Sequence, residues 1–91
     1  MEKKKRANPE LLKSVELMLS PDYKDRFIAE YMQLKTRKEG LEKMLQSHID
    51  GTLGFTPTCP IKDLTDQVVS MGVYQDILKK RAKIEDIELD E

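Results

Sequence analysis

The sequence predicts an all-α protein, with a short N-terminal helix followed by a long antiparallel α-helical hairpin. Three observations predict this fold class. Charged residues are 36% and hydrophobic residues 38% of the 91-residue chain, while aromatic residues are only 5%, a balance typical of helices with large solvated surfaces. Apolar residues recur every three or four positions through two long segments. Proline stands near the start of each expected helix, where its missing N–H costs nothing.

The first helix is expected over residues 9–19 and the second over residues 21–49. Asn8 and Ser20 can each cap an N-terminus, and each is followed by proline. Asp50-Gly51 ends the second helix, because glycine readily takes the left-handed conformation of a C-cap. The second helix carries an apolar stripe with a period of about 3.6 residues, made of Tyr23, Phe27, Tyr31, Leu34, Leu41, Met44, Leu45 and His48.

The third helix is expected over residues 60–84, with Cys59 as its capping residue and Pro60 at its start. Its own stripe consists of Ile61, Leu64, Val68, Met71, Tyr74, Leu78 and Ala82. Residues 8–85 therefore form one helical domain. We expect residues 1–7 to be a flexible basic N-terminus and residues 86–91 to be an acidic tail in solvent.

The apolar stripes of a two-helix hairpin bury too little surface to offset the conformational entropy lost when the helices are ordered. We therefore expect the first helix to pack across the pair. We also expect further copies of the chain to cover the remaining apolar surface, so that the protein is a homo-oligomer.

The connection at residues 50–59 is longer and more apolar than a turn between two helices requires. Leu53 and Phe55 would be costly to leave in water, and we expect them to fold back as a plug over the end of the hairpin. Thr56 and Thr58 place hydroxyl groups near the start of the third helix, where an anion is favoured. A capping loop without a ligand is the alternative.

Composition excludes several classes of protein. A single cysteine cannot form an internal disulfide and suits a reducing cytosol. A net charge of −1 removes the electrostatic basis for general nucleic-acid binding. The basic start is followed by no apolar run, so we expect no signal peptide, and no segment approaches the length of a membrane span.

No catalytic pattern is present in the sequence. The lone His48 has no motif around it, and Cys59 has no histidine or second cysteine with which to form a zinc site or an activated nucleophile. The sequence contains no phosphate-binding loop and no dinucleotide fingerprint. We expect a protein that is not an enzyme and that holds no metal and no cofactor.

Two basic clusters are candidates for a binding site. Tyr23, Lys24 and Arg26 crowd a helix start that already favours anions. Further along, Arg37 and Lys38 interrupt the apolar stripe, where they either reach out to solvent or ion-pair, or face a ligand. The second cluster lies too far along the helix to join the first within one chain. A shared ligand site would therefore need an antiparallel neighbour, at a subunit interface.

Three blocks of the sequence carry a resemblance to a known family. The first comprises Ser20, Asp22, Tyr23, Lys24, Arg26, Phe27, Glu30, Tyr31, Gln33, Leu34, Lys35 and Arg37. The second comprises Gly51, Thr52, Leu53, Gly54, Phe55, Pro57, Cys59 and Pro60. The third comprises Met71, Tyr74, Ile77, Leu78, Arg81, Ala82, Ile84 and Glu85. Together they resemble a family of small phage and prophage proteins of Gram-positive bacteria, which is labelled by similarity to a crAss-like phage protein.

The resemblance implies a context, the cytoplasm of a bacterial host, but no activity. In shape, the expected fold is more remotely similar to the helical-hairpin sponges with which phages trap immune nucleotides, although the short motifs of those sponges are absent. We hypothesise a counter-defence protein that sequesters a cyclic oligonucleotide or a cyclic ADP-ribose. The alternatives are a protein-binding inhibitor or adaptor of a host defence protein, for which the acidic tail is the candidate surface, and a purely structural helical oligomer.

Overall fold

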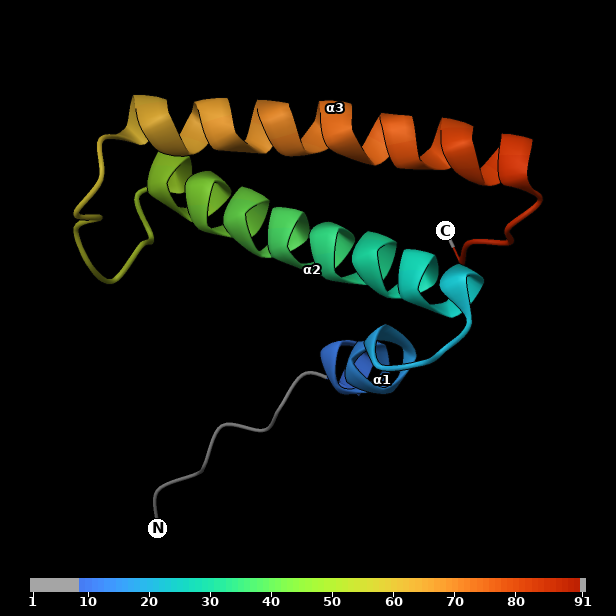
Figure 1. The fold of residues 1–91 in the computed structure, drawn as a ribbon. Helices are drawn as coiled ribbons and strands as arrows, with labels where there is room; N and C mark the ends of the chain where they lie inside the picture. Colours follow the sequence, from blue (N-terminus) through green and yellow to red (C-terminus); the bar gives the residue numbers. More distant parts are fainter. Residues whose placement is uncertain (1–8, 91) are drawn as a thin grey trace, which may run out of the picture.

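The computed structural model describes residues 9–90 and contains three helices, α1 (Pro9–Met18), α2 (Tyr23–Asp50) and α3 (Ile61–Glu85) (Figure 1). No strand occurs among the residues that it describes, so the predicted all-α class is confirmed. The expected cap at Asn8 and the basic segment 1–7 lie outside the described residues.

Helix α2 begins two residues later than predicted, because Asp22 and not Ser20 is its N-cap. The Asp22 carboxylate accepts the backbone N–H of Lys24 at 3.0 Å. Ser20 instead ties the preceding turn together, since its hydroxyl accepts the backbone N–H of Asp22 and donates to the carboxylate of Asp25 at 2.8 Å. At the other end Gly51, with a φ of 76°, forms the predicted left-handed cap.

Cys59 does not cap α3. Pro60 is the N-cap residue of this helix, and no side chain caps it. The Cys59 side chain is exposed.

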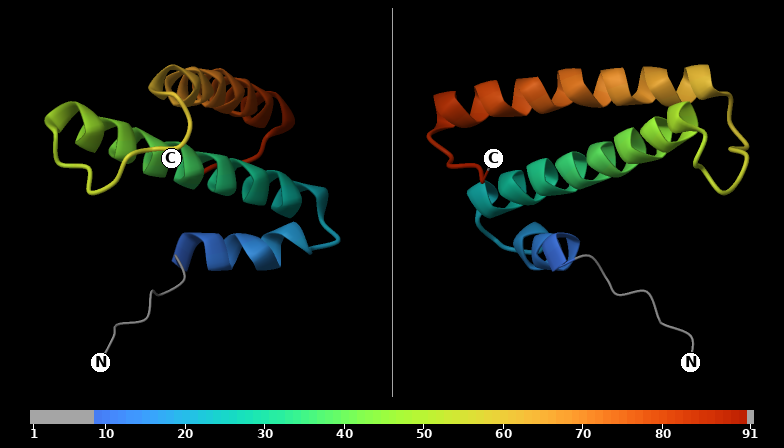
Figure 2. Two further views of the ribbon diagram at one scale, coloured as in Figure 1. Left: turned by 90° about the vertical axis from the view of Figure 1, so that its left-hand side faces the viewer. Right: turned by 180° about the vertical axis from the view of Figure 1, so that it is seen from behind.

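Helix α2 lies between the other two helices (Figures 1 and 2), and α1 and α3 both contact it without contacting each other. Its N-terminal end lies beside the C-terminal end of α3, where the Tyr23 hydroxyl donates to Glu85. The two helices therefore run antiparallel. Helix α1 docks through its buried Ser14, whose hydroxyl accepts a hydrogen bond from the side-chain amide of Gln33 at 3.1 Å.

The hydrophobic core is concentrated at one end of the α2–α3 pair. It consists of Phe27, Tyr31, Leu34, Leu78, Ala82 and Ile87. Towards the other end of α2, Leu41 and Leu45 are only half-buried, and His48 is exposed. The apolar stripe predicted for the second helix is therefore well packed in its first half only.

The C-terminal segment contributes Ile87 to the core, so the prediction of a solvated tail was wrong for Ile87 and Leu89, whereas Asp86, Glu88 and Asp90 are exposed as predicted. Asp86 takes a left-handed conformation with a φ of 59°, and the N–H of Ile87 returns to the carbonyl of Ala82 at 2.8 Å. The segment thus turns back from the end of α3 (Figure 1) and brings Ile87 into the core, with Leu89 packed against it. Burial of these two apolar side chains stabilises the return of the chain, and Glu88 between them stays in water.

The loop between α2 and α3 does not plug the hairpin. The side chain of Phe55 is 59% exposed, and Leu53 is only half-buried. The predicted plug was wrong because the core lies at the opposite end of the helix pair, out of reach of this loop.

We expect Ile87→Ala to lower the free energy of unfolding by about 2 to 5 kcal/mol, the usual range for truncating a buried isoleucine. Ile87 is 7% exposed, whereas Ile49 is 75% exposed. Ile49→Ala is therefore a matched control and should change the stability by less than about 0.5 kcal/mol. Urea denaturation of both variants measures the difference, and equal stabilities would contradict the packing of the tail.

Candidate functional site

Tyr23 and Lys24, two of the residues predicted to bind a ligand, hold the start of α2 to the end of α3. The Tyr23 hydroxyl donates to Glu85 Oε1 at 2.8 Å and accepts a hydrogen bond from Arg81 Nη2 at 2.7 Å. Arg81 Nε also donates to Glu85 Oε2 at 3.2 Å. Lys24 Nζ donates to the backbone carbonyl of Asp86 at 3.2 Å. We call Tyr23, Arg81 and Glu85 the clasp.

The clasp lies directly over the core. The Arg81 guanidinium stands 5.0 Å from the centre of the Phe27 ring, and the Tyr23 ring meets the same ring edge to face at 6.2 Å. A cation over an aromatic face is attracted by the negative face of the ring. Arg81 therefore links the polar surface of this end of the molecule to its apolar interior.

Hydrogen bonding within the clasp changes the proton affinity of all three groups. The bond to Glu85 raises the pKa of Tyr23, because the carboxylate holds the phenolic proton. That same bond lowers the pKa of Glu85, with further help from Arg81. The bond to Glu85 also raises the pKa of Arg81. The clasp is therefore held in the state in which Tyr23 is neutral and Glu85 and Arg81 are charged.

Arg26 and Arg37 line one groove on the molecular surface, with a volume of about 280 Å³. We call it the Arg26–Arg37 groove. It is lined by Met18, Arg26, Glu30, Gln33, Leu34, Arg37 and Tyr74. The two arginines are about three helical turns apart, so they lie on the same face of α2. The expectation that the second basic cluster could join the first only through a neighbouring chain was therefore wrong for Arg37.

The groups in the groove differ in how firmly they are held. Arg26 Nη1 donates to the backbone carbonyl of Ser20 at 2.9 Å, and the Tyr74 hydroxyl donates to the carboxylate of Glu30. Arg37 is exposed and has no ion-pair partner among residues 9–90. The groove thus offers one uncommitted guanidinium, a second one fixed by the backbone, and an aromatic ring, beside the apolar side chains of Met18 and Leu34.

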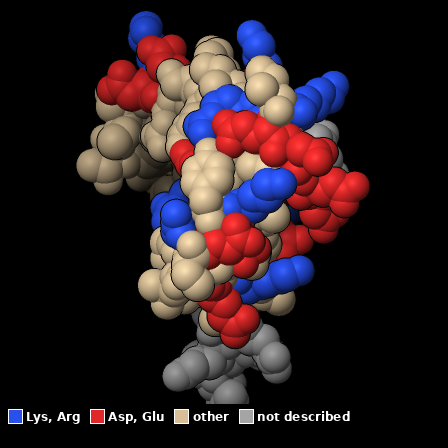
Figure 3. Space-filling view, turned by 45° about the vertical axis from the view of Figure 1, so that its right-hand side comes forward, with Lys and Arg blue, Asp and Glu red and all other residues tan. Residues whose placement is uncertain are grey.

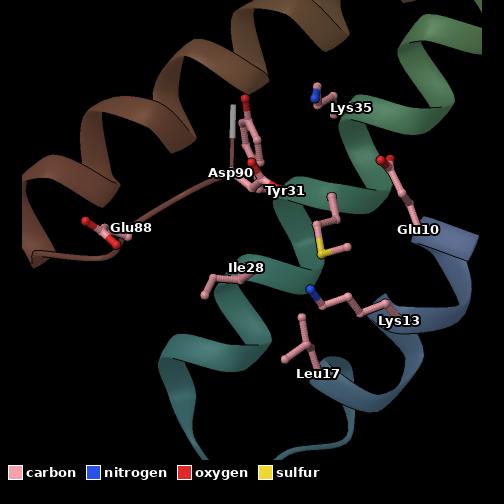
Figure 4. Close-up of a pocket in the computed structure, with 9 residues that line it drawn as sticks. Glu10, Lys13, Leu17, Ile28, Tyr31, Lys35, Glu88 and Asp90 are labelled. Atoms are coloured by element: carbon pink, nitrogen blue, oxygen red, sulfur yellow. The ribbon is translucent and has the colours of Figure 1, made fainter.

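A larger cavity of about 520 Å³ lies between α1, α2 and the C-terminal segment (Figure 4). Lys13 and Lys35 line it together with Glu10, Glu88 and Asp90. Two ammonium groups among three carboxylates give no net attraction for an anion. For an anionic ligand the smaller groove is therefore the better candidate.

Lys38, Thr56 and Thr58 do not join the Arg26–Arg37 groove. Lys38 ion-pairs with Glu42 at 3.3 Å, and its side chain passes over Gly72 of α3. Thr56 and Thr58 are exposed in the loop at the far end of the α2–α3 pair from Tyr23 (Figure 1). The candidate ligand residues are thus divided among the clasp, the groove, the middle of α2 and the loop.

Sequence reasoning missed Tyr74, Glu30 and Arg81. Tyr74 was assigned to the apolar stripe of the third helix, yet it is 42% exposed. The missing information was the register between the two long helices, which sets Tyr74 beside Glu30 and Gln75 beside Tyr31. The pairing of Tyr23 with Glu85 fixes this register. Eleven residues further along each of the antiparallel helices, it sets Tyr74 opposite Leu34, in the Arg26–Arg37 groove.

On the face in Figure 3, Lys and Arg side chains are interspersed with Asp and Glu, without a continuous basic patch. Among residues 9–90, no group of three or more His, Cys, Asp or Glu side chains could hold a metal ion. No helix in this range is long and apolar enough to cross a membrane.

One comparison with known proteins gives a match. A family model described as Sequestin matches residues 21–84, which is more than half of the chain. The matched range includes α2, the loop and nearly all of α3, and with them the Arg26–Arg37 groove except for Met18. No curated protein and no solved structure matches the chain.

The clasp predicts a measurable change in the titration of Glu85. Tyr23→Phe removes the hydroxyl that donates to this carboxylate, so the pKa of Glu85 should rise towards its ordinary value. A lowered folded-state pKa stabilises the protein above the unfolded-state pKa, and this contribution is lost as the pH falls through the folded value. The variant should therefore show a weaker loss of stability with acid.

NMR titration of the side-chain carboxyl carbon of Glu85 measures this shift. Tyr74→Phe is the control, because it removes a tyrosine hydroxyl that donates to Glu30 and leaves the clasp intact. If the pKa of Glu85 is the same in the wild type and in Tyr23→Phe, the hydrogen bond between them does not control its proton affinity.

Proposed function

Since the chain belongs to the Sequestin family, we propose that it is a binding protein that sequesters a small anionic ligand without converting it. The family name denotes sequestration, and the chemistry of the Arg26–Arg37 groove fits a ligand that carries both phosphate and a planar base. We propose a cyclic oligonucleotide or a ligand of the cyclic ADP-ribose type.

The single observation that carries this proposal is that Arg26, Arg37 and Tyr74 line the same groove. A guanidinium presents several N–H donors in a plane and can bind two phosphate oxygens at once. A tyrosine ring can stack on a base of any sequence, because every base has an aromatic face. The neighbouring Met18 and Leu34 lower the local polarity, which strengthens both contacts.

Binding without conversion is consistent with the residues that line the groove. They include no histidine, cysteine, serine or lysine that could act as a nucleophile or general base. The carboxylate of Glu30 is already engaged by the Tyr74 hydroxyl. A bound nucleotide would therefore meet mainly groups that hold it, and recovery of the intact ligand tests whether the Tyr74–Glu30 pair attacks it.

We further propose that the ligand is an immune signal of a bacterial host and that the protein serves a phage as a counter-defence factor in the host cytoplasm. The support for this is the resemblance of residues 20–37 and 51–60 to small phage proteins.

A second candidate function is the binding of a host defence protein at the loop between α2 and α3. The exposed side chains of Phe55 and Ile49 favour it, since large apolar residues in water mark many protein interfaces. The acidic segment is a poorer candidate for this role than its sequence indicates, because Ile87 is committed to the core.

We expect Arg37→Ala to weaken ligand binding by about tenfold to a hundredfold, because a charge-assisted hydrogen bond contributes about 1.5 to 3 kcal/mol. Tyr74→Ala should weaken binding through lost stacking, by about 1 to 3 kcal/mol. The measurement is calorimetric titration with a panel of cyclic dinucleotides, cyclic trinucleotides and cyclic ADP-ribose isomers, followed by chromatography to show that the ligand is recovered intact.

Lys43→Ala is the matched control, because Lys43 is an exposed cation on the same helix that does not line the groove. It should bind like the wild type. If no member of the panel binds the wild type at tens of micromolar, nucleotide sequestration is rejected and the loop becomes the surface to test. If a nucleotide of the panel binds the wild type and Arg37→Ala with equal affinity, its binding site lies outside the Arg26–Arg37 groove.

A further inference from the structure

Helix α3 carries apolar side chains on two opposite faces. Leu78 and Ala82 are buried against α2. On the far side of the helix lies a second set, which we call the outer stripe, made of Val69, Val73, Ile77 and Ile84. Each of the four is between 51% and 73% exposed. A helix that is covered on one face only has no reason to be apolar on the other, so the outer stripe calls for a partner.

The outer stripe belongs to a pattern that is symmetrical about Val73. Counting outwards in either direction, the positions on this face follow at intervals of four, three and four residues, the spacing of a coiled-coil seam. In chain order they are Lys62, Asp66, Val69, Val73, Ile77, Lys80 and Ile84. A spacing that reads the same from both ends suits pairing with an inverted copy of itself, in which the aliphatic stem of Lys62 packs against Ile84 of the partner subunit.

The charges on this face select the orientation of such a pair. In a parallel pair, Asp66 would meet Asp66 of the partner subunit and Lys80 would meet its own counterpart, so like charges would repel. In an antiparallel pair with its twofold axis at Val73, Asp66 meets Lys80 of the partner subunit on both sides of the axis. Between these ion pairs, Val69 packs against Ile77 of the partner subunit.

We infer that a second copy of this chain covers the outer stripe, giving a twofold-symmetric dimer in which the two α3 helices run antiparallel. The apolar centre supplies the burial, and the two pairs of opposite charge at its edges fix the register. Asp66 is exposed and contacts Lys62 of its own chain at 2.8 Å. It remains accessible to a partner, because the side chains of Lys62 and Asp66 are 82% and 61% exposed, respectively.

The dimer also bears on the ligand site, and this part of the inference rests on the proposed function. Tyr74 follows the axial residue Val73 and points about 100° away from it around the helix. In an antiparallel pair, the two Tyr74 side chains therefore emerge on the same face, one on each side of the axis. The two Arg26–Arg37 grooves therefore open on one face of the dimer, but the paired α3 helices hold them about 20 Å apart, so each groove binds its own ligand.

The dimer is tested first without any ligand. Sedimentation equilibrium of the full chain at about 100 µM should give twice 10.6 kDa. Asp66→Lys and Lys80→Glu should each raise the dimer dissociation constant at least tenfold, because each places like charges opposite one another. Mixing the two variants in equal amounts should restore the dimer mass, since every opposed pair in the mixed dimer is again of opposite charge.

Val73→Glu tests the axis itself, where it would bring two carboxylates together. Val73 is largely exposed in the single chain, so circular dichroism should show an unchanged fold and sedimentation should show a monomer. Leu12→Glu, on the exposed face of α1, is the control and should leave the dimer intact. A monomeric wild type, a mixture that stays monomeric, or a dimer broken by Leu12→Glu but not by Val73→Glu would each overturn the inference.

The ligand arm uses cyclic di-AMP and cyclic di-GMP as probes. We expect one molecule to bind per chain, with equal affinity in the wild type and in Val73→Glu, because each groove lies within one chain and Val73 does not line it. Binding of one molecule per two chains, weakened in Val73→Glu, would overturn the separate grooves and leave the proposed function standing. If neither these two probes nor the wider nucleotide panel binds the wild type, the proposed function fails, while the ligand-free dimer is judged by its own measurements.

Discussion

The hydrogen-bonded clasp between the start of α2 and the end of α3 is the contact on which the rest of the structure depends. Tyr23 meets Arg81 and Glu85 there, although they are 58 and 62 residues away along the chain. Exposed polar contacts such as these are individually weak in water. Their position makes them important, because Arg81 also covers the ring of Phe27, which belongs to the hydrophobic core. Fixing these two helix ends sets the register of the whole pair, and the register in turn brings Tyr74 to the groove that Arg26 and Arg37 line.

The same arrangement divides the molecule into two halves of unequal packing. Next to the clasp, α2, α3 and the returning C-terminal segment share a continuous core. Towards the loop, side chains such as Leu45 and Leu64 are only half-buried, and Ile49 and Phe55 face solvent. Local stability follows the density of buried apolar contacts. The loop end should therefore exchange its amide hydrogens faster than the clasp end. The Arg26–Arg37 groove lies in the better-packed half, where its side chains rest on a rigid base.

The helices could be predicted from the sequence because their signals are local. Proline at a helix start, glycine at a helix end and a period of 3.6 residues act within a few positions of one another. Arg26 and Arg37 could be singled out for the same reason, as cations at unusual places on a single helix. Tyr74 could not, because its neighbours Glu30 and Arg37 belong to another helix, and one residue of slip between the helices would remove it from the groove. The role of Ile87 could not be predicted either, because an apolar residue among acids does not indicate whether the chain turns back at Asp86.

The return of Ile87 to the core has a consequence for how the protein folds as it is made. The groups that complete the core and the clasp, Arg81, Glu85 and Ile87, lie more than fifty residues downstream of their partners Tyr23 and Phe27. During synthesis, α1 and α2 leave the ribosome first and can pair through Ser14 and Gln33, but the cover of Phe27 stays incomplete until Leu78, Arg81 and Ile87 have emerged. Contacts this distant along the chain close late. An aromatic surface therefore stays exposed until the end of α3 and the segment after it have been made, and the core closes in a late step.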